Sequence, residues 1–274
     1  FKTIDLTGGT NKTVQFEGAV KVTNLNIGKA GHAGAAKVRL GDDLDAEVLF
    51  LDDQTQTGEL EVFGAAVHNI TGDINKNIGA DESRGKIIIA NDVGTNAVTF
   101  KGQIGDTANK KAINHLHILN NNAGGSVVLE GGDVHIEKIQ AAGAGSLKLN
   151  EANAKYKFGE IVVDADNVFA LEVDENVVLK APAAGSVNFG SSGNGGKRLS
   201  ELKFNADKSL TIENGVNIYA AELNKTGVNN KGTLIFEGDS ILSADSATQN
   251  IKAIEIRGNG NTVKLSKATE THQD

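Results

Sequence analysis

The stretch GGSVVLEGGDVHIEKIQAAGAGSLKLNEANAKYKF, at 124–158, contains the pattern that decides the fold. Short apolar bursts, such as the one at 127–129, are bounded by glycine pairs, which tolerate the tight turns between strands. The dipeptide Gly-Ser at 125–126 returns at 145–146 and is again followed by alternating apolar and polar residues. A strand that returns at this spacing indicates one coil of a solenoid.

The same kind of burst recurs along nearly the whole chain, mostly at steps of about 20 to 24 residues. Propeller blades need about 40 residues each, and a hairpin barrel would show steps of about 8 to 12 residues with no longer period. The sequence therefore predicts an all-β, single-stranded, right-handed parallel β-helix with about 20 to 24 residues per coil. We expect the β-helix to span residues 1–266 and a polar, frayed tail to occupy residues 267–274. One apolar marker per burst gives the series Val14, Val38, Leu60, Val98, Val127, Leu147, Leu171, Leu210 and Leu234.

Alternation along each strand predicts which side chains point into the core. In the opening stretch Val134 is expected to face inward, whereas His135 and Glu137 are expected to face outward. The side chains predicted to be buried in stacks are Leu129, Ile136, Leu149, Phe158, Leu171 and Phe236.

Composition narrows the class of protein. Aromatic residues make up 4% of the chain and Trp is absent, which favours thin layers of Val, Ile and Leu. A net charge of −8 argues against nucleic acid or an anionic membrane as the main partner. The lack of Cys excludes disulfides and thiolate chemistry. No apolar run approaches the roughly 18 residues of a membrane span. The chain starts in the middle of a strand pattern without Met, so we expect it to be a fragment of a longer protein.

Three segments carry a resemblance to a known family: VTFKGQIG at 98–105, GTLIFEGD at 232–239 and NLNIG at 24–28. They resemble the passenger repeats of bacterial autotransporters, and the texture rich in Ala, Asn, Gly and Val is similar to the rickettsial surface cell antigens of the outer-membrane protein A and B group. The resemblance extends over nearly the whole chain and rests on degenerate repeats.

This resemblance implies a β-helical passenger on the bacterial cell surface or outer membrane. Such a passenger mediates adhesion to host cells or their invasion, or it serves as the rigid stalk of the adhesin. The implied partners are a host-cell surface protein and, in the full-length protein, a C-terminal membrane β-barrel. We expect a monomer that binds no nucleic acid, has no cofactor and is not an enzyme. The alternative is a carbohydrate-active β-helix enzyme, a polysaccharide lyase or hydrolase.

Two short motifs resemble catalytic or phosphate-binding loops. Gly-Asp-Ser at 238–240 is similar to the nucleophile turn of trypsin-like passenger proteases, but Ile241 stands where the oxyanion loop needs Gly. The stretch 190–197 has the glycines of a phosphate loop without their spacing, and Arg198 replaces the magnesium-binding hydroxyl residue. We interpret the first as a turn between strands and the second as a protruding loop, and we expect no catalytic residue.

Acidic clusters are the basis of the enzyme alternative, because β-helical lyases and hydrolases place carboxylates on one strand face. Asp164 and Asp166, at i and i+2, would share a face. Solvated turns explain these acids more simply, because sugar clefts usually need aromatic platforms and this chain has no Trp and only Tyr156 and Tyr219. The clusters are Asp42, Asp43 and Asp45, then Asp52 and Asp53, then Asp164 and Asp166.

The offset between the two Gly-Ser dipeptides, applied locally, would place His135 over His115 and Glu137 over His117, all facing outward. These four side chains form a candidate metal patch, and a simple polar face is the other interpretation; we expect no metal. Clustered imidazoles would also gain charge near pH 6. Recognition loops are expected between coils, at Gly28–Ala36, Asp52–Gly58, Gly72–Gly85, Gly105–Lys111 and Gly190–Arg198.

Overall fold

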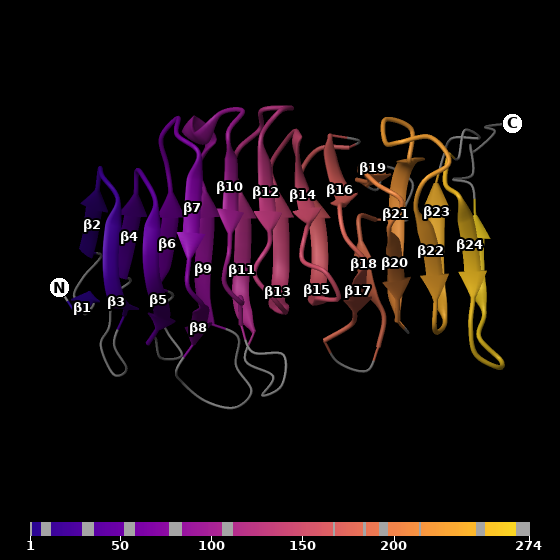
Figure 1. Ribbon diagram of the computed structural model, residues 1–274, viewed down its shortest axis with the longest axis horizontal. Coiled ribbons are helices and arrows are strands. Elements are labelled where there is room, and N and C mark those ends of the chain that lie inside the picture. Colours follow the sequence, from indigo (N-terminus) through magenta and orange to yellow (C-terminus); the bar gives the residue numbers. More distant parts are fainter. Residues whose placement is uncertain are drawn as a thin grey trace, which may run out of the picture.

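The computed structural model describes residues 2–6, 12–28, 36–51, 58–76, 84–105, 112–166, 168–182, 185–191, 197–213, 215–244 and 250–266. Within these ranges the chain forms 25 strands and one short 3-10 helix, η1 (Asn91–Val93). No helix in this described part is long and apolar enough to cross a membrane. The strands pair in parallel and stack coil on coil along the longest axis, with the indigo N-terminal strands and the yellow C-terminal strands at opposite ends of the molecule (Figure 1). The predicted parallel β-helix is thus confirmed, while the predicted tail at 267–274 lies outside the described residues.

The pairings form three ladders, which we name faces A, B and C. The chain passes from A to B to C and back to A. Face A contains β2 (Lys12–Phe16), β4 (Ala36–Leu40), β6 (Glu59–Val62), β9 (Arg84–Ile89), β11 (Ile113–Ile118), the second halves of β13 (Val134–Ala141) and β15 (Lys155–Val163), β18 (Val187–Phe189), the first half of β21 (Val216–Leu223), β23 (Ser240–Ala244) and β25 (Val263–Ser266).

The other two faces are built in the same way. Face B contains the starts of β3 (Val20–Ile27) and β5 (Leu44–Phe50), then β7 (His68–Thr71), β10 (Ala97–Phe100), β12 (Ser126–Leu129), β14 (Gly145–Leu149), β16 (Phe169–Val173), β19 (Leu199–Phe204) and the second half of β21. Face C contains β1 (Thr3–Leu6), the remainders of β3 and β5, β8 (Ile74–Lys76), the first halves of β13 and β15, β17 (Val177–Lys180), β20 (Ser209–Ile212), β22 (Thr233–Phe236) and β24 (Ala253–Ile256).

The expected coil length holds in some parts of the stack and is exceeded in others. Ser126 pairs with Ser146, which is the offset that the repeated Gly-Ser dipeptide predicts. Val177 pairs with Leu210, so the coil between them is longer than any that the repeat predicts. The longer coils carry extra residues at the corners between faces, such as η1 between β9 and β10.

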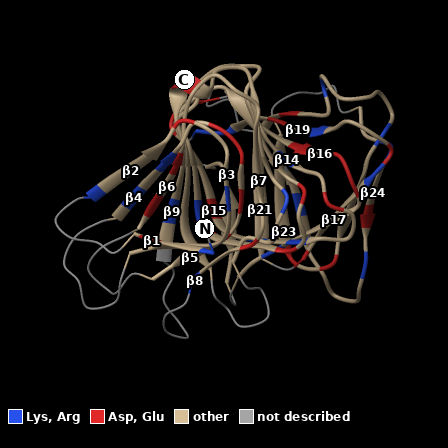
Figure 2. Ribbon diagram, turned by 60° about the vertical axis from the view of Figure 1, so that its left-hand side comes forward, with Lys and Arg blue, Asp and Glu red and all other residues tan. Residues whose placement is uncertain are grey.

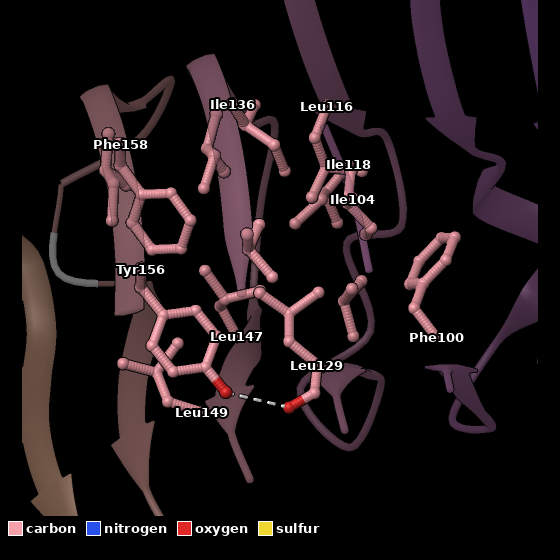
Figure 3. Close-up of a cluster of buried hydrophobic side chains, with 14 of the residues drawn as sticks. Phe100, Ile104, Leu116, Ile118, Leu129, Ile136, Leu147, Leu149, Tyr156 and Phe158 are labelled. Atoms are coloured by element: carbon pink, nitrogen blue, oxygen red, sulfur yellow. Dashed lines mark hydrogen bonds between the residues drawn. The ribbon is translucent and has the colours of Figure 1, made fainter. Parts of the chain in front are cut away.

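Inward side chains form continuous apolar rows along the stack. On face B, Phe100, Leu129 and Leu149 occupy successive positions of one row, and Figure 3 shows this part of the core. The phenol of Tyr156 lies in the same interior and donates a hydrogen bond to the carbonyl oxygen of Leu129 at 3.1 Å. All six side chains predicted to be buried, Leu129, Ile136, Leu149, Phe158, Leu171 and Phe236, are at most 1% exposed.

Glycine allows the close approach of successive coils at the corner between faces B and C. A Cβ atom on Gly102 would lie 2.0 Å from the carbonyl oxygen of Gly72, and one on Gly131 would lie 2.0 Å from the carbonyl carbon of Lys101. Gly72 itself has a φ of +105° and lies against the backbone of Ala46. Any side chain at these positions would force the coils apart, so this corner requires glycine.

Replacing Leu149 with Asp is expected to lower the free energy of unfolding by about 3 to 5 kcal/mol, because it buries an unpaired carboxylate between two apolar rungs. Chemical denaturation followed by circular dichroism measures the change. The matched control is Thr99→Ala on the outer side of β10 in the same face, which should cost no more than about 1 kcal/mol. An equal, small effect of both substitutions would contradict the inward assignment of Leu149.

Candidate functional site on the outer surface of face A

The outward side chains of face A lie in rows that run across the coils, because each strand pairs in register with the next. The first row alternates in charge around a central histidine. Glu59 lies between Lys37 and Lys86, with nitrogen-to-oxygen distances of 3.5 and 3.7 Å, and Lys138 lies 3.5 Å from Glu160. Charges of both signs therefore mark these strands (Figure 2). The members of the row are Thr13, Lys37, Glu59, Lys86, His115, Lys138 and Glu160.

The second row of face A begins with a charged network and continues with less polar residues. The guanidinium of Arg39 lies 2.9 Å from a carboxylate oxygen of Glu61 and 4.3 Å from the ring centroid of Phe63. Burial alone would raise the pKa of Glu61, but hydrogen bonds from Lys37 and Arg39 and their charges outweigh it, so the pKa falls below its ordinary value. The members of the row are Gln15, Arg39, Glu61, Ile88, His117, Gln140 and Val162.

A third, mostly apolar row follows the ends of the face A strands. Backbone hydrogen bonds align Phe63, Ala90, Leu119 and Ala142 in successive coils. Leu119 is 38% exposed, and Phe63, Ala90 and Ala142 are half-buried. We use the name "outer patch" for the neighbouring apolar and imidazole side chains of the second and third rows on these coils: Phe63, Ile88, Ala90, His117, Leu119, Ala142 and Val162.

Two histidines occupy the centre of face A. His115 and His117 both point outward from β11, and their rings stack with centroids 5.0 Å apart and planes 13° apart. Partial burial, together with the charges of His117, Lys86 and Lys138, lowers the pKa of His115 to about 4. The pKa of His117 is lowered too, chiefly by burial and by Lys86. The expectation that this cluster gains charge near pH 6 is therefore wrong for His115, which stays neutral there.

The predicted four-residue metal patch does not assemble, because the coil between β11 and β13 is three positions longer than the Gly-Ser repeat predicts. His115 lies beside Lys138, and His117 lies beside Gln140. His135 pairs instead with Lys157, and its side chain is 2% exposed, contrary to the outward assignment. Three consecutive residues of β13 from Val134 are buried, so alternation fails where this strand turns from face C to face A.

Glu137 stays near His135. Its carboxylate oxygen lies 3.5 Å from Nε2 of His135, within the same strand. Among the residues that the structure describes, no group of three His, Cys, Asp or Glu side chains is placed to hold a metal ion.

The acidic clusters serve as hydrogen-bond acceptors between coils. Asp164 accepts hydrogen bonds of 3.0 Å from the side chain of Gln140 in the preceding coil. Asp166 accepts one of 2.9 Å from the backbone N–H of Arg198 in the following coil. The two carboxylates thus contact opposite neighbours in the stack.

Asp side chains also accept hydrogen bonds from the adjacent coil at other corners. Asp43 accepts the backbone N–H of Asn69 at 2.7 Å, and Asp73 accepts that of Gln103 at 2.8 Å. Asp45 forms an ion pair with Lys21 instead. Asp52 and Asp53 lie outside the described residues.

The Gly-Asp-Ser motif lies at the start of a face A strand. Ser240 begins β23 and is 5% exposed, while Asp239 accepts a hydrogen bond of 2.6 Å from the backbone N–H of Thr262. Residues 192–196 of the glycine-rich stretch lie outside the described residues. One shallow pocket lies where face A meets face B, and its lining includes Asn120, Gly125 and Phe169.

The expected recognition loops fall largely outside the described residues, at 29–35, 52–57, 77–83, 106–111 and 192–196. Their described neighbours show where these segments join the fold. The first four each follow a face C position and precede a face A strand, so they connect the same two faces.

Glu172 and His68 are among the charged or polar residues that the fold buries and that sequence analysis missed. Glu172 of face B is 7% exposed and lies 3.7 Å from both Lys148 and Lys203 in the adjacent coils. Burial opposes its ionisation, yet hydrogen bonds from Asn205 and Ser146 and the two lysines lower its pKa overall. His68 is fully buried beside Val98. Lys148, Glu172 and Lys203 occupy the same position in three successive coils. Only an alignment of the chain that allowed each coil its own length would have revealed this row.

Comparison with known proteins agrees with this architecture. Over 286 aligned residues the chain is 29% identical to outer membrane protein B of Rickettsia prowazekii (strain Madrid E), and the alignment covers 92% of this chain and 16% of the relative. The chain is similar to a rickettsial surface antigen. Outer membrane protein B of Rickettsia rickettsii is 25% identical over 284 residues, with the same coverage of both chains.

The resemblance that the repeats predicted is thereby confirmed. The chain spans only 16% of the length of these curated relatives. No family model matches the chain. No solved structure matches it either.

The pKa of His115 predicts a dependence of stability on pH. Between pH 7 and pH 5 the unfolded imidazole, with a pKa near 6.5, takes up a proton, whereas folded His115, with a pKa of about 4, does not. The unfolded state binds more protons, so acidification lowers the free energy of unfolding. After a discount for solvent screening, the contribution of this one residue is about 1 kcal/mol.

Urea denaturation at pH 7 and pH 5 measures this effect in the wild-type chain and in His115→Gln. The variant should lose less stability on acidification, while contributions from carboxylates cancel in the comparison. Identical losses in the two proteins would show that His115 titrates normally.

Proposed function

We propose that this chain is a segment of the surface-exposed passenger of an autotransporter, located at the bacterial outer membrane or cell surface. The observation that carries the proposal is its similarity to outer membrane protein B over 92% of its length, combined with a β-solenoid along that length. A solenoid of stacked coils is stiff and presents long, regular faces. These properties suit a rod that holds binding residues away from a membrane.

Within this role, the proposed activity is adhesion to a protein of the host-cell surface through face A. Protein interfaces combine an apolar or aromatic centre with a polar rim. The outer patch has this composition: Leu119 and Val162 are apolar and outward, and Lys86, Lys138 and Glu160 border them along the first row. The binding energy would come mainly from the apolar centre, and the charges would set the orientation of the partner.

Binding of fluorescent beads coated with the purified chain to cultured host cells tests this proposal. The double substitution Leu119→Glu and Val162→Lys places charges in the outer patch and should lower cell binding at least about tenfold, as expected when the apolar centre of an interface is lost. The matched control is Val178→Glu, which changes an outward apolar residue of face C. Thermal denaturation confirms that the variants remain folded.

Each outcome has a distinct meaning. Binding by the wild type that is lost only in the face A variant supports adhesion through the outer patch. Binding that survives both substitutions would contradict the assignment to face A. A folded wild-type chain that does not bind cells would contradict adhesion by this segment and leave the rigid stalk as its role.

A further inference from the structure

The stacked histidines of β11 have the arrangement of a chelating pair. They stand at i and i+2 on one strand face, and their rings are nearly parallel at a centroid distance of 5.0 Å. The two rings therefore lie face to face on the outer side of β11. The pair is therefore different from the four-residue patch, because one strand supplies both rings.

The backbone beneath this pair is held in place on both sides. Leu116, which lies between the two histidines and points into the core, pairs with Ile87 of β9 and Ile139 of β13. A strand in the interior of a sheet loses little freedom when its side chains bind a ligand, and this preorganisation favours chelation.

One of the ring nitrogens of this pair has no competing hydrogen bond among the described residues. Nε2 of His115 is buried and has no hydrogen-bond partner among the described atoms. A buried polar atom of this kind usually has a partner, which can be an ordered water or an ion. Neutral imidazole nitrogen is a preferred ligand of zinc and copper.

We propose that His115 and His117 form a bidentate site for a divalent transition metal of the zinc and copper type, with water completing the coordination. The described residues supply no third His, Cys, Asp or Glu to this set, so the site is open. Metal–nitrogen distances of about 2.0 to 2.1 Å require the two donor atoms to lie about 3.4 Å apart around tetrahedral zinc and about 2.9 Å apart around tetragonal copper. The stacked rings must therefore tilt toward each other at their nitrogen edges when the metal binds.

The charges around the two histidines limit the affinity of this site for a metal ion. Lys86 and Lys138 lie on either side of His115, and both disfavour a cation. The charge of Lys86 is partly neutralised by Glu59 at 3.7 Å, and that of Lys138 by Glu160 at 3.5 Å. An open, two-ligand site between two lysines predicts a dissociation constant in the micromolar range and tighter binding when one lysine loses its charge.

Isothermal titration of the untagged chain with CuCl₂, and separately with ZnCl₂, tests the proposal. Copper should bind more tightly than zinc, following the usual order for nitrogen ligands. His115→Ala and His117→Ala should each weaken binding at least about tenfold, since each removes one of two protein ligands. Lys138→Gln should strengthen binding about two- to fivefold by removing a positive charge near the metal. Circular dichroism of each variant confirms that the fold is retained.

Electron paramagnetic resonance of the copper complex gives a second readout that does not depend on affinity. Two coordinated imidazole nitrogens should be visible in the wild type and one in either His→Ala variant. Copper that binds equally well to the wild type and to both alanine variants would overturn the proposal, because the ion would then occupy other ligands. Absence of saturable binding at micromolar copper would overturn it as well. These outcomes are independent of the cell-binding experiment.

Discussion

No coil of this protein can satisfy its own backbone, so the hydrogen bonds between successive coils are the interaction on which the whole structure depends. The N–H of His135 donates to the carbonyl of Ile104 in the coil before it, at 2.7 Å, and Val178 does the same to Ala154 at 3.0 Å. Burial of an unpaired backbone group costs free energy comparable to a lost hydrogen bond. The coils must therefore stack at the spacing of a parallel sheet, and the corner glycines permit this by leaving room for backbone against backbone.

Stacking in register has a consequence for every side chain. Each residue is surrounded by the residues at the same position in the coils before and after it, so like types gather in rows. Inside, this gives apolar rows such as Phe100, Leu129 and Leu149. Outside, it gives alternating charges, because like charges directly opposite one another are destabilising. The same geometry places His115 between Lys86 and Lys138, and burial together with these charges lowers the pKa of both imidazoles.

Sequence reasoning predicted the architecture because the repeat and the strand alternation are local signals. Leu129 and Leu149 could be assigned to the core from one Gly-Ser dipeptide and its return, since the coil between them has the length that the repeat indicates. The outer surface was harder to predict, because the length of each coil determines which outward side chains lie side by side in adjacent coils. The coil between β11 and β13 is longer than the repeat predicts, so Lys138 and not His135 lies beside His115. The burial of His135 could not be read from alternation, because β13 turns from one face to another at that point.

The central claim is that coils stack one by one along a single axis, and distances between spin labels test it most directly. The chain has no native Cys, so pairs of engineered cysteines label it without interference. Thr13, Lys138 and Lys264 lie on one row of face A, and the pairing register places five steps between the first two and ten between the first and the last. At about 4.8 Å per step, the Thr13→Cys/Lys138→Cys pair should lie about 24 Å apart and the Thr13→Cys/Lys264→Cys pair about 48 Å apart. Electron–electron double resonance that finds this twofold ratio supports the stacked rod. Similar distances for both pairs would mean that the chain closes on itself, which would contradict it.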